Sequence, residues 1–120
     1  MKKFIMVCGV ACPQRVSCLE YQKRILNDDY VIVNKDISVE QIQEYCSEGK
    51  NIIWDDLNLY PEVREVRLSL IPDDYHKTAV YVKPTDKDLE DPDMKVKMMQ
   101  FVCPSEFENF QCIMRYQSPQ

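Results

Sequence analysis

The segment from Gly9 to Ser17 carries residue types that proteins use to bind phosphate. It joins an apolar run to a predicted helix, which is where a phosphate-binding loop lies. Such a loop reads GxxxxGK followed by Ser or Thr. Its backbone N–H groups surround the phosphate, its lysine neutralises charge, and its hydroxyl holds Mg²⁺. Gly9, Arg15 and Ser17 are therefore the candidate nucleotide-binding residues.

Most positions of this segment depart from that pattern. Gln14 stands at the second glycine, Arg15 at the lysine and Val16 at the hydroxyl. Pro13 also lacks an N–H donor. A guanidinium can supply positive charge, but it is a planar fork rather than a compact ammonium. Taken alone, the segment is at most a degenerate phosphate-binding loop, and Arg15 can equally be read as a surface residue.

Short apolar runs alternate with helical patterns along the chain, which is typical of a parallel sheet covered by helices. Two helices have a recognisable start, one in the capping box Ser38 to Gln41 and one at Pro61. In the second of these, Val63, Val66, Leu70 and Ile71 are expected on one buried face. The strands are predicted at Lys3–Cys8, Tyr30–Asn34, Asn51–Trp54, His76–Val82 and Gln111–Tyr116. The helices are predicted at Val16–Leu26, from Ser38 to about Ser47, from Pro61, and at Met94–Val102, with loops at Val10–Gln14 and Thr85–Asp93.

These elements predict an α/β fold with three layers, α/β/α, around a five-stranded, mainly parallel sheet. One domain is expected to span residues 1–120, because this length is close to that of a typical single domain. Ligands of such folds bind beyond the carboxyl ends of the strands. The segments of interest therefore follow the strands: Gly9–Ser17, Asn34–Asp36, Asp55–Asn58 and Lys83–Asp86.

Composition argues against several other classes of protein. The net charge of −5 and the pI of about 4.9 argue against a protein that mainly grips the backbone of nucleic acids. No apolar run approaches the length of about 18 residues that spans a bilayer. The apolar run after Lys3 is too short for a signal peptide, which favours a cytosolic protein.

The six cysteines predict neither a metal site nor a disulfide framework. No pair has the CxxC spacing of a zinc site, and the single histidine, His76, belongs to no ligand pattern. Cys8 and Cys112 lie in apolar runs and are expected in the core. Cys12 lies in a predicted loop beside Arg15, so either a thiol of lowered pKa or an ordinary loop cysteine is compatible with its position.

Three segments give the chain a resemblance to a known family. They are Asn34-Lys35-Asp36 after the second predicted strand, Asn51–Arg64 (NIIWDDLNLYPEVR) around the third, and Met99–Tyr116 (MQFVCPSEFENFQCIMRY) near the end. Together they resemble the small P-loop kinases of the phage polynucleotide kinase family over nearly the whole chain. The resemblance implies a P-loop kinase-like fold. It also implies that Asp36 matches the general base and Asp56 the carboxylate that positions substrate and base. Family framework positions would be Asn58, Leu59, Pro61, Glu62 and Arg64.

The departures from that family concern its positive charges. The family places an arginine shortly after the base, where this chain has Ile37-Ser38-Val39. Its lid carries arginines, where this chain has the acidic segment Thr85–Asp93. Losing one such clamp can lower the rate by several orders of magnitude. The aspartates also have plainer interpretations, Asp36 as a helix-end charge and Asp55-Asp56 as a solvated turn.

Three functions remain open on this reading. The favoured one is a kinase-like protein without phosphoryl transfer that binds a macromolecular partner, expected to be a protein. The phage resemblance suggests a viral protein acting on a host factor in the host cytoplasm. The alternatives are an active kinase that uses ATP and Mg²⁺ with Asp36 as base, and a sensor that binds a nucleotide without chemistry. Only the active kinase requires a cofactor. Asp88, Glu90 and Asp91 are the candidate partner-binding residues, since an acidic surface suits a basic target.

Overall fold

A computed structural model describes residues 2–116, in which five parallel strands form one sheet in the order β2-β3-β1-β4-β5. The strands are β1 (Lys2–Cys8), β2 (Val31–Val33), β3 (Ile52–Asp55), β4 (Tyr75–Tyr81) and β5 (Cys112–Arg115). β1 lies in the middle, where Phe4 is paired with Ile52 of β3 and Lys77 of β4. The predicted α/β class with a five-stranded sheet is confirmed, and every pairing is parallel.

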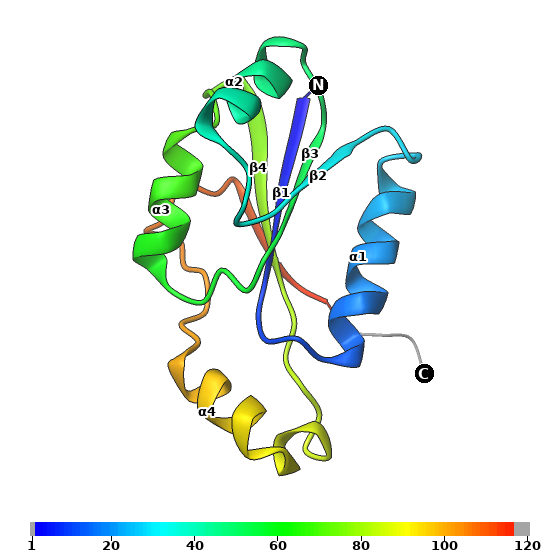
Figure 1. The fold of residues 1–120 in the computed structure, drawn as a ribbon, viewed down its shortest axis with the longest axis vertical. Helices are drawn as coiled ribbons and strands as arrows, with labels where there is room; N and C mark the ends of the chain where they lie inside the picture. The colour runs from blue at the N-terminus through cyan, green and yellow to red at the C-terminus, as the bar shows by residue number, and fades with distance from the viewer. Residues whose placement is uncertain (1, 117–120) are drawn as a thin grey trace.

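Three helices cover the two faces of this sheet: α1 (Pro13–Ile25), α2 (Val39–Ser47) and α3 (Pro61–Ser69) (Figure 1). A short 3₁₀ helix, η1 (Asp88–Glu90), and α4 (Pro92–Gln100) follow β4. Across the sheet, the chain moves in one direction from β1 to β2. It then moves in the opposite direction, from β2 to β3 and from β3 to β4. Because such crossovers are right-handed, α1 lies on one face and α2 and α3 lie on the opposite face.

The two faces of β1 build two separate parts of the core. Phe4, Met6 and Cys8 face α2 and α3, and they pack in a cluster with Ile42 and Leu68. The alternate side chains face α1; this second cluster contains Ile5, Val7, Cys18 and Leu26. A strand buried on both faces explains why the segment reads as an unbroken apolar run.

The start of α1 differs from the prediction. Pro13 was expected within a loop, but it is the first residue of the helix and Cys12 is the N-cap. A proline fits this position because the N–H that it lacks has no acceptor in the first turn. As a result Arg15, two residues further on, lies in the first turn of α1 and is buried.

The predicted buried face of α3 is wrong for its first half. Val66 is 65% exposed and Val63 is 37% exposed, whereas Arg64 and Leu68 are buried. Ile71 is buried as expected. An apolar pattern misplaced this face because a charged residue, Arg64, takes a core position that the valines were expected to fill.

The acidic segment is also more ordered than the predicted loop. Within Thr85–Asp93 the chain forms η1, and α4 begins at Pro92 instead of Met94. Neither helix buries a side chain. Both project from the carboxyl ends of the strands, at the bottom of Figure 1. The N-cap at Ser38 is confirmed, since its hydroxyl accepts a hydrogen bond from the Gln41 N–H at 3.1 Å, but the Gln41 side chain donates to Glu44 Oε2 at 3.5 Å and does not complete the predicted capping box.

The cysteines divide between core and surface. Cys8 is buried as expected, but Cys112 on the edge strand β5 is only half-buried, because no helix covers it there. Cys12 is buried beneath α1. Within residues 2–116, no helix has the length and apolar character needed to cross a membrane.

Candidate functional site

The carboxyl ends of β1 and β3 are where the fold would bind a ligand. These two strands are neighbours, yet the chain leaves β1 for α1 on one face and leaves β3 for α3 on the other. Diverging connections of this kind create the usual binding position of an open parallel sheet. Here the two connections are joined directly, because Gly9 N–H donates to the carbonyl of Leu57 at 2.8 Å.

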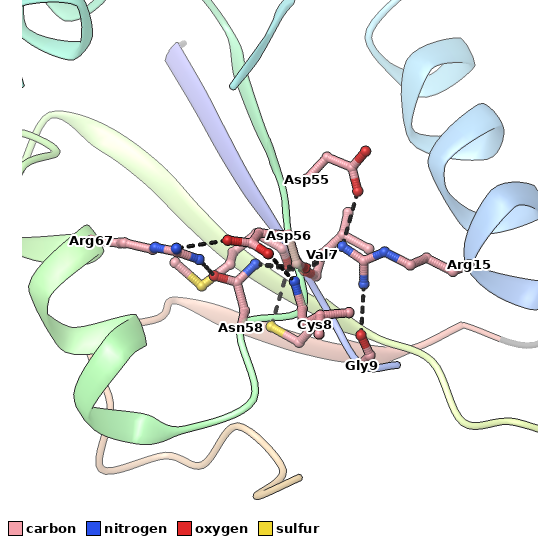
Figure 2. A network of polar contacts seen from close by, with 10 residues as sticks. Val7, Cys8, Gly9, Arg15, Asp55, Asp56, Asn58 and Arg67 are labelled. Atoms are coloured by element: carbon pink, nitrogen blue, oxygen red, sulfur yellow. Dashed lines mark hydrogen bonds and ion pairs between the residues drawn. The ribbon is translucent and has the colours of Figure 1, made fainter. Parts of the chain in front are cut away.

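Arg15 holds these strand ends together from the α1 side (Figure 2). Its Nη1 donates to the carbonyl of Gly9 at 3.0 Å, and its Nη2 to the carbonyl of Val7 at 3.3 Å. Nη2 also pairs with Asp55 Oδ1 at 2.9 Å and donates to the carbonyl of Asp56. The guanidinium therefore binds four oxygens of the protein itself. The Arg15 side chain is only 10% exposed, so it is not the surface residue considered above.

Arg67 holds the same loop from the α3 side, opposite Arg15 in Figure 2. Its Nη2 donates to Asp56 Oδ2 at 2.7 Å, and its Nη1 donates to Asn58 Oδ1 at 2.5 Å. The guanidinium also lies 5.0 Å from the ring centroid of Trp54, where it makes a cation–π contact. Asp56 is thus neutralised and oriented within the fold.

Asn58 completes this polar cluster. Its backbone has a φ of +48°, which asparagine tolerates better than most residues. In this conformation Nδ2 donates to the carbonyls of Val7 at 2.8 Å and Asp56 at 3.0 Å. We call the cluster the β1–β3 network. Its members are Val7, Gly9, Arg15, Asp55, Asp56, Asn58 and Arg67.

Gly9 has a structural reason to be glycine. Its φ is +126°, and a Cβ at this position would lie 2.6 Å from the carbonyl oxygen of Val82. The close approach brings the end of β1 against the residue that follows β4. Since its N–H is bonded to Leu57, Gly9 offers no free donor to a phosphate in this conformation.

A buried ion pair between Arg64 and Glu108 lies next to the network and contacts it at Asn58. Arg64 Nε lies 2.6 Å from Glu108 Oε1, and Arg64 Nη2 lies 3.1 Å from Glu108 Oε2. The side chains are 0% and 9% exposed, respectively. Arg64 Nη1 also donates to the carbonyl of Asn58 at 2.8 Å, which ties α3 and the 105–109 turn to the loop after β3.

The remaining candidate residues lie outside the β1–β3 network. Asp36 is exposed in the turn after β2, and its N–H donates to Asn34 Oδ1 at 2.9 Å. Ser17 lies in α1, half-buried. The structure therefore joins Gly9, Arg15 and Asp56 in one network but gives neither Asp36 nor Ser17 a hydrogen bond to it among residues 2–116.

The acidic candidates have local contacts of their own. Asp88 Oδ2 accepts from the Thr85 N–H at 3.0 Å, and Asp91 is the N-cap of α4, accepting from the Asp93 N–H at 2.9 Å. Glu90 is exposed. Carboxylates at the start of a helix are favoured by its dipole, so local stability alone accounts for part of this acidity.

Sequence reasoning missed Arg67 as a member of the network. The available signal was its spacing of three from Arg64, which places two arginines on one side of a short helix. Their carboxylate partners are Asp56 and Glu108, 11 and 44 residues away, and no local pattern indicates such pairings. No cluster of metal-ligating side chains occurs in the part of the chain that the structure describes.

Comparison with known proteins adds no relative. No protein-family model matches the chain, and no curated protein matches it. The resemblance to the phage polynucleotide kinases thus stays a prediction carried by the residues given above.

Proposed function

We propose that the chain is a P-loop kinase-like protein that does not transfer phosphoryl groups and acts by binding another protein. The strand order, with β1 central and followed by a loop and α1, supports the kinase-like part of this proposal. The resemblance to a phage family favours a viral protein that acts on a host factor in the cytoplasm.

The observation that carries the proposal is the use of Arg15. In a phosphate-binding loop the basic residue faces the ligand, whereas here its guanidinium binds the carbonyls of Val7, Gly9 and Asp56 and the carboxylate of Asp55. A phosphate would need to displace a buried, charge-assisted set of hydrogen bonds, which are stronger than bonds between neutral groups.

The space beside this loop also disfavours a nucleoside triphosphate. A pocket of about 120 Å³ lies between Val10 and the start of α4, and its lining includes the carboxylates of Asp91 and Asp93 together with Lys97. Small-molecule sites usually have about 300–1,000 Å³. Two carboxylates would also repel a polyphosphate.

The test is calorimetric titration with Mg²⁺-ATP, while hydrolysis is followed in the same sample. We expect no binding and no turnover. Binding accompanied by transfer would favour the active kinase, and Asp36→Asn should then abolish turnover. Binding without turnover would favour the sensor. Either result overturns the proposed loss of nucleotide use.

The acidic part of the proposal needs its own variant. Asp88 and Asp91 also stabilise η1 and α4, so reversing them would disturb the fold locally. Glu90→Lys changes charge without removing such a contact, and Glu48→Lys, at the exposed end of α2, is its matched control. Once a partner has been isolated by pull-down, Glu90→Lys should weaken its binding more than Glu48→Lys.

A further inference from the structure

The face of the sheet that carries α1 is only partly covered. Among the described helices α1 covers most of this face, and Met94 of α4 also packs against its cluster. β4 and β5 extend beyond α1. On these two strands Thr78 is paired with Cys112, and Val80 is paired with Met114. Of these four, Met114 is 44% exposed and Cys112 is half-buried, which marks the open part of the face.

Two adjoining hollows lie in this open part, with volumes of about 370 and 210 Å³. Both are lined by Gln22 of α1 and Met114 of β5. We call the combined depression the α1–β5 groove and define it by the residues that matter below: Lys3, Tyr21, Gln22, Arg24, Met114 and Tyr116. Its two halves extend from His76 to Val80 along β4, which corresponds to about 13 Å at the usual rise of a strand.

The rim of the groove is basic, although the protein as a whole is acidic. Arg24 lines one hollow and Lys3 lines the other. Both are exposed, and no carboxylate of residues 2–116 lies within ion-pair distance of either one. The Arg24 guanidinium lies 6.0 Å from the ring centroid of Tyr21. Tyr21 in turn lies against Tyr116, with ring centroids 5.9 Å apart. The rim thus presents two cations and two tyrosines, and arginine and tyrosine are enriched where partners bind tightly.

The floor of the groove is apolar with one polar group. Ile25 is 41% exposed on the α1 side, and Val80 closes the bottom. Gln22 contributes its side-chain amide to both hollows, and its Nε2 lies 4.0 Å from Cys18 Sγ. A partner would therefore meet one amide among apolar groups.

These features fit one kind of occupant. A helix is the element that packs beside another helix on the same face of a sheet. Apolar side chains on one side of it would contact Met114 and Val80, and acidic side chains would face Lys3 and Arg24. A length of about 13 Å corresponds to about nine residues of helix. We propose that the α1–β5 groove binds an acidic amphipathic helix of a partner protein.

This inference adds a second surface for the partner binding proposed above, distinct from the acidic segment around Glu90, and it does not depend on the loss of kinase activity. Its test needs no nucleotide, so failure of one proposal is distinguishable from failure of the other. The probe is a fluorescein-labelled, stapled helical peptide of about 14 residues, or about 21 Å. Leucines follow the spacing of one helix face, and glutamates flank them. A scrambled peptide of equal composition and a peptide with lysine at each glutamate are the controls.

Fluorescence anisotropy should show that the full chain binds the acidic amphipathic peptide, more weakly at higher salt, and binds neither control peptide comparably. The double variant K3E/R24E should lose about tenfold or more in affinity. The double variant K50E/K95E changes the net charge equally at exposed positions away from the groove, and its affinity should stay within about twofold. Circular dichroism of both variants checks that they fold.

Several results would overturn the proposal. These are no binding of the acidic peptide, equal binding of the scrambled peptide, or equal loss of affinity in the two double variants. Sedimentation tests a different occupant, a second copy of the chain. If the protein is a dimer that Met114→Asp converts to monomers, the groove is occupied by its own copy and not by an acidic helix.

Discussion

The β1–β3 network and the α1–β5 groove use arginine in opposite ways. In the network, Arg15 and Arg67 donate to carbonyls and carboxylates of the same chain. Next to the network, Arg64 is paired with Glu108. At the groove, Arg24 is exposed, and the described residues provide no carboxylate partner for it. The usual binding position of the fold therefore has its charges satisfied internally, whereas the groove has a cation without a carboxylate partner. The groove proposal accordingly places partner binding where charge is available and not at the usual position in the fold.

The largest expected effect compares Arg64 with Arg115. Arg64→Ala leaves Glu108 as a buried, unpaired carboxylate, which should reduce the free energy of unfolding by about 3–5 kcal/mol. Arg115→Ala on the edge strand β5, where the arginine is exposed, should change it by at most about 0.5 kcal/mol. Urea denaturation followed by circular dichroism measures both. Similar losses for the two variants would contradict the distinction between structural and available arginines.

An intermediate effect compares two arginines of the same helix, Arg15 and Arg24. Arg15→Ala removes donors from several buried carbonyls, but Asp55 is 33% exposed and can be hydrated. We therefore expect a loss of about 2 kcal/mol for Arg15→Ala and nearly none for Arg24→Ala. In peptide binding the order should reverse, with only Arg24→Ala weakening the acidic helical peptide. A variant at position 15 that loses peptide affinity while it stays folded would break the comparison.

The smallest effect concerns the thiols of the two regions. Burial raises the pKa of Cys8 to about 12 and that of Cys18 to about 11, so both are protonated and shielded near neutral pH. Cys103 is exposed, and Cys112 lines the groove. Peptide mapping after brief iodoacetamide treatment should find Cys103 and Cys112 modified first. The acidic peptide should slow the modification of Cys112 only. Equally fast modification of Cys8 would mean that the network opens.

The fold was largely predictable from the chain, and the reasons are local. The apolar run of β1, the N-cap at Ser38 and the proline at position 61 each act within a few residues, so each marks its element. The errors arose where contacts between residues far apart in the sequence determine which side chains are buried. Arg64 takes a core position on α3 only because Glu108, 44 residues later, neutralises it.

The candidate site was predicted in part. The segment after β1 and the aspartates after β3 do come together at the strand ends. The chain pattern, however, gives no sign that Arg15 folds back onto the carbonyls of Val7 and Gly9. No pattern in the sequence indicated the α1–β5 groove. Tyr21 and Tyr116 are 95 residues apart in the sequence. They meet only because α1 packs on the face of the sheet next to the end of β5.

The contacts at the two ends of the η1–α4 segment have a consequence for how the chain tolerates insertion and exchange. The segment leaves the sheet where Val82 N–H donates to the carbonyl of Cys8 at 3.0 Å. It returns where Val102 N–H donates to the carbonyl of Leu59 at 2.9 Å. Both anchors belong to the residues around the sheet, and between them Met94 and Phe101 pack, half-buried, against the two parts of the core. Since the entropy of closing a loop grows only with the logarithm of its length, longer or shorter replacements should alter it little. Residues 83–101 thus form a module whose sequence can change with little effect on the sheet as long as apolar side chains replace Met94 and Phe101, a suitable place for new binding specificities to arise by exchange of this one segment.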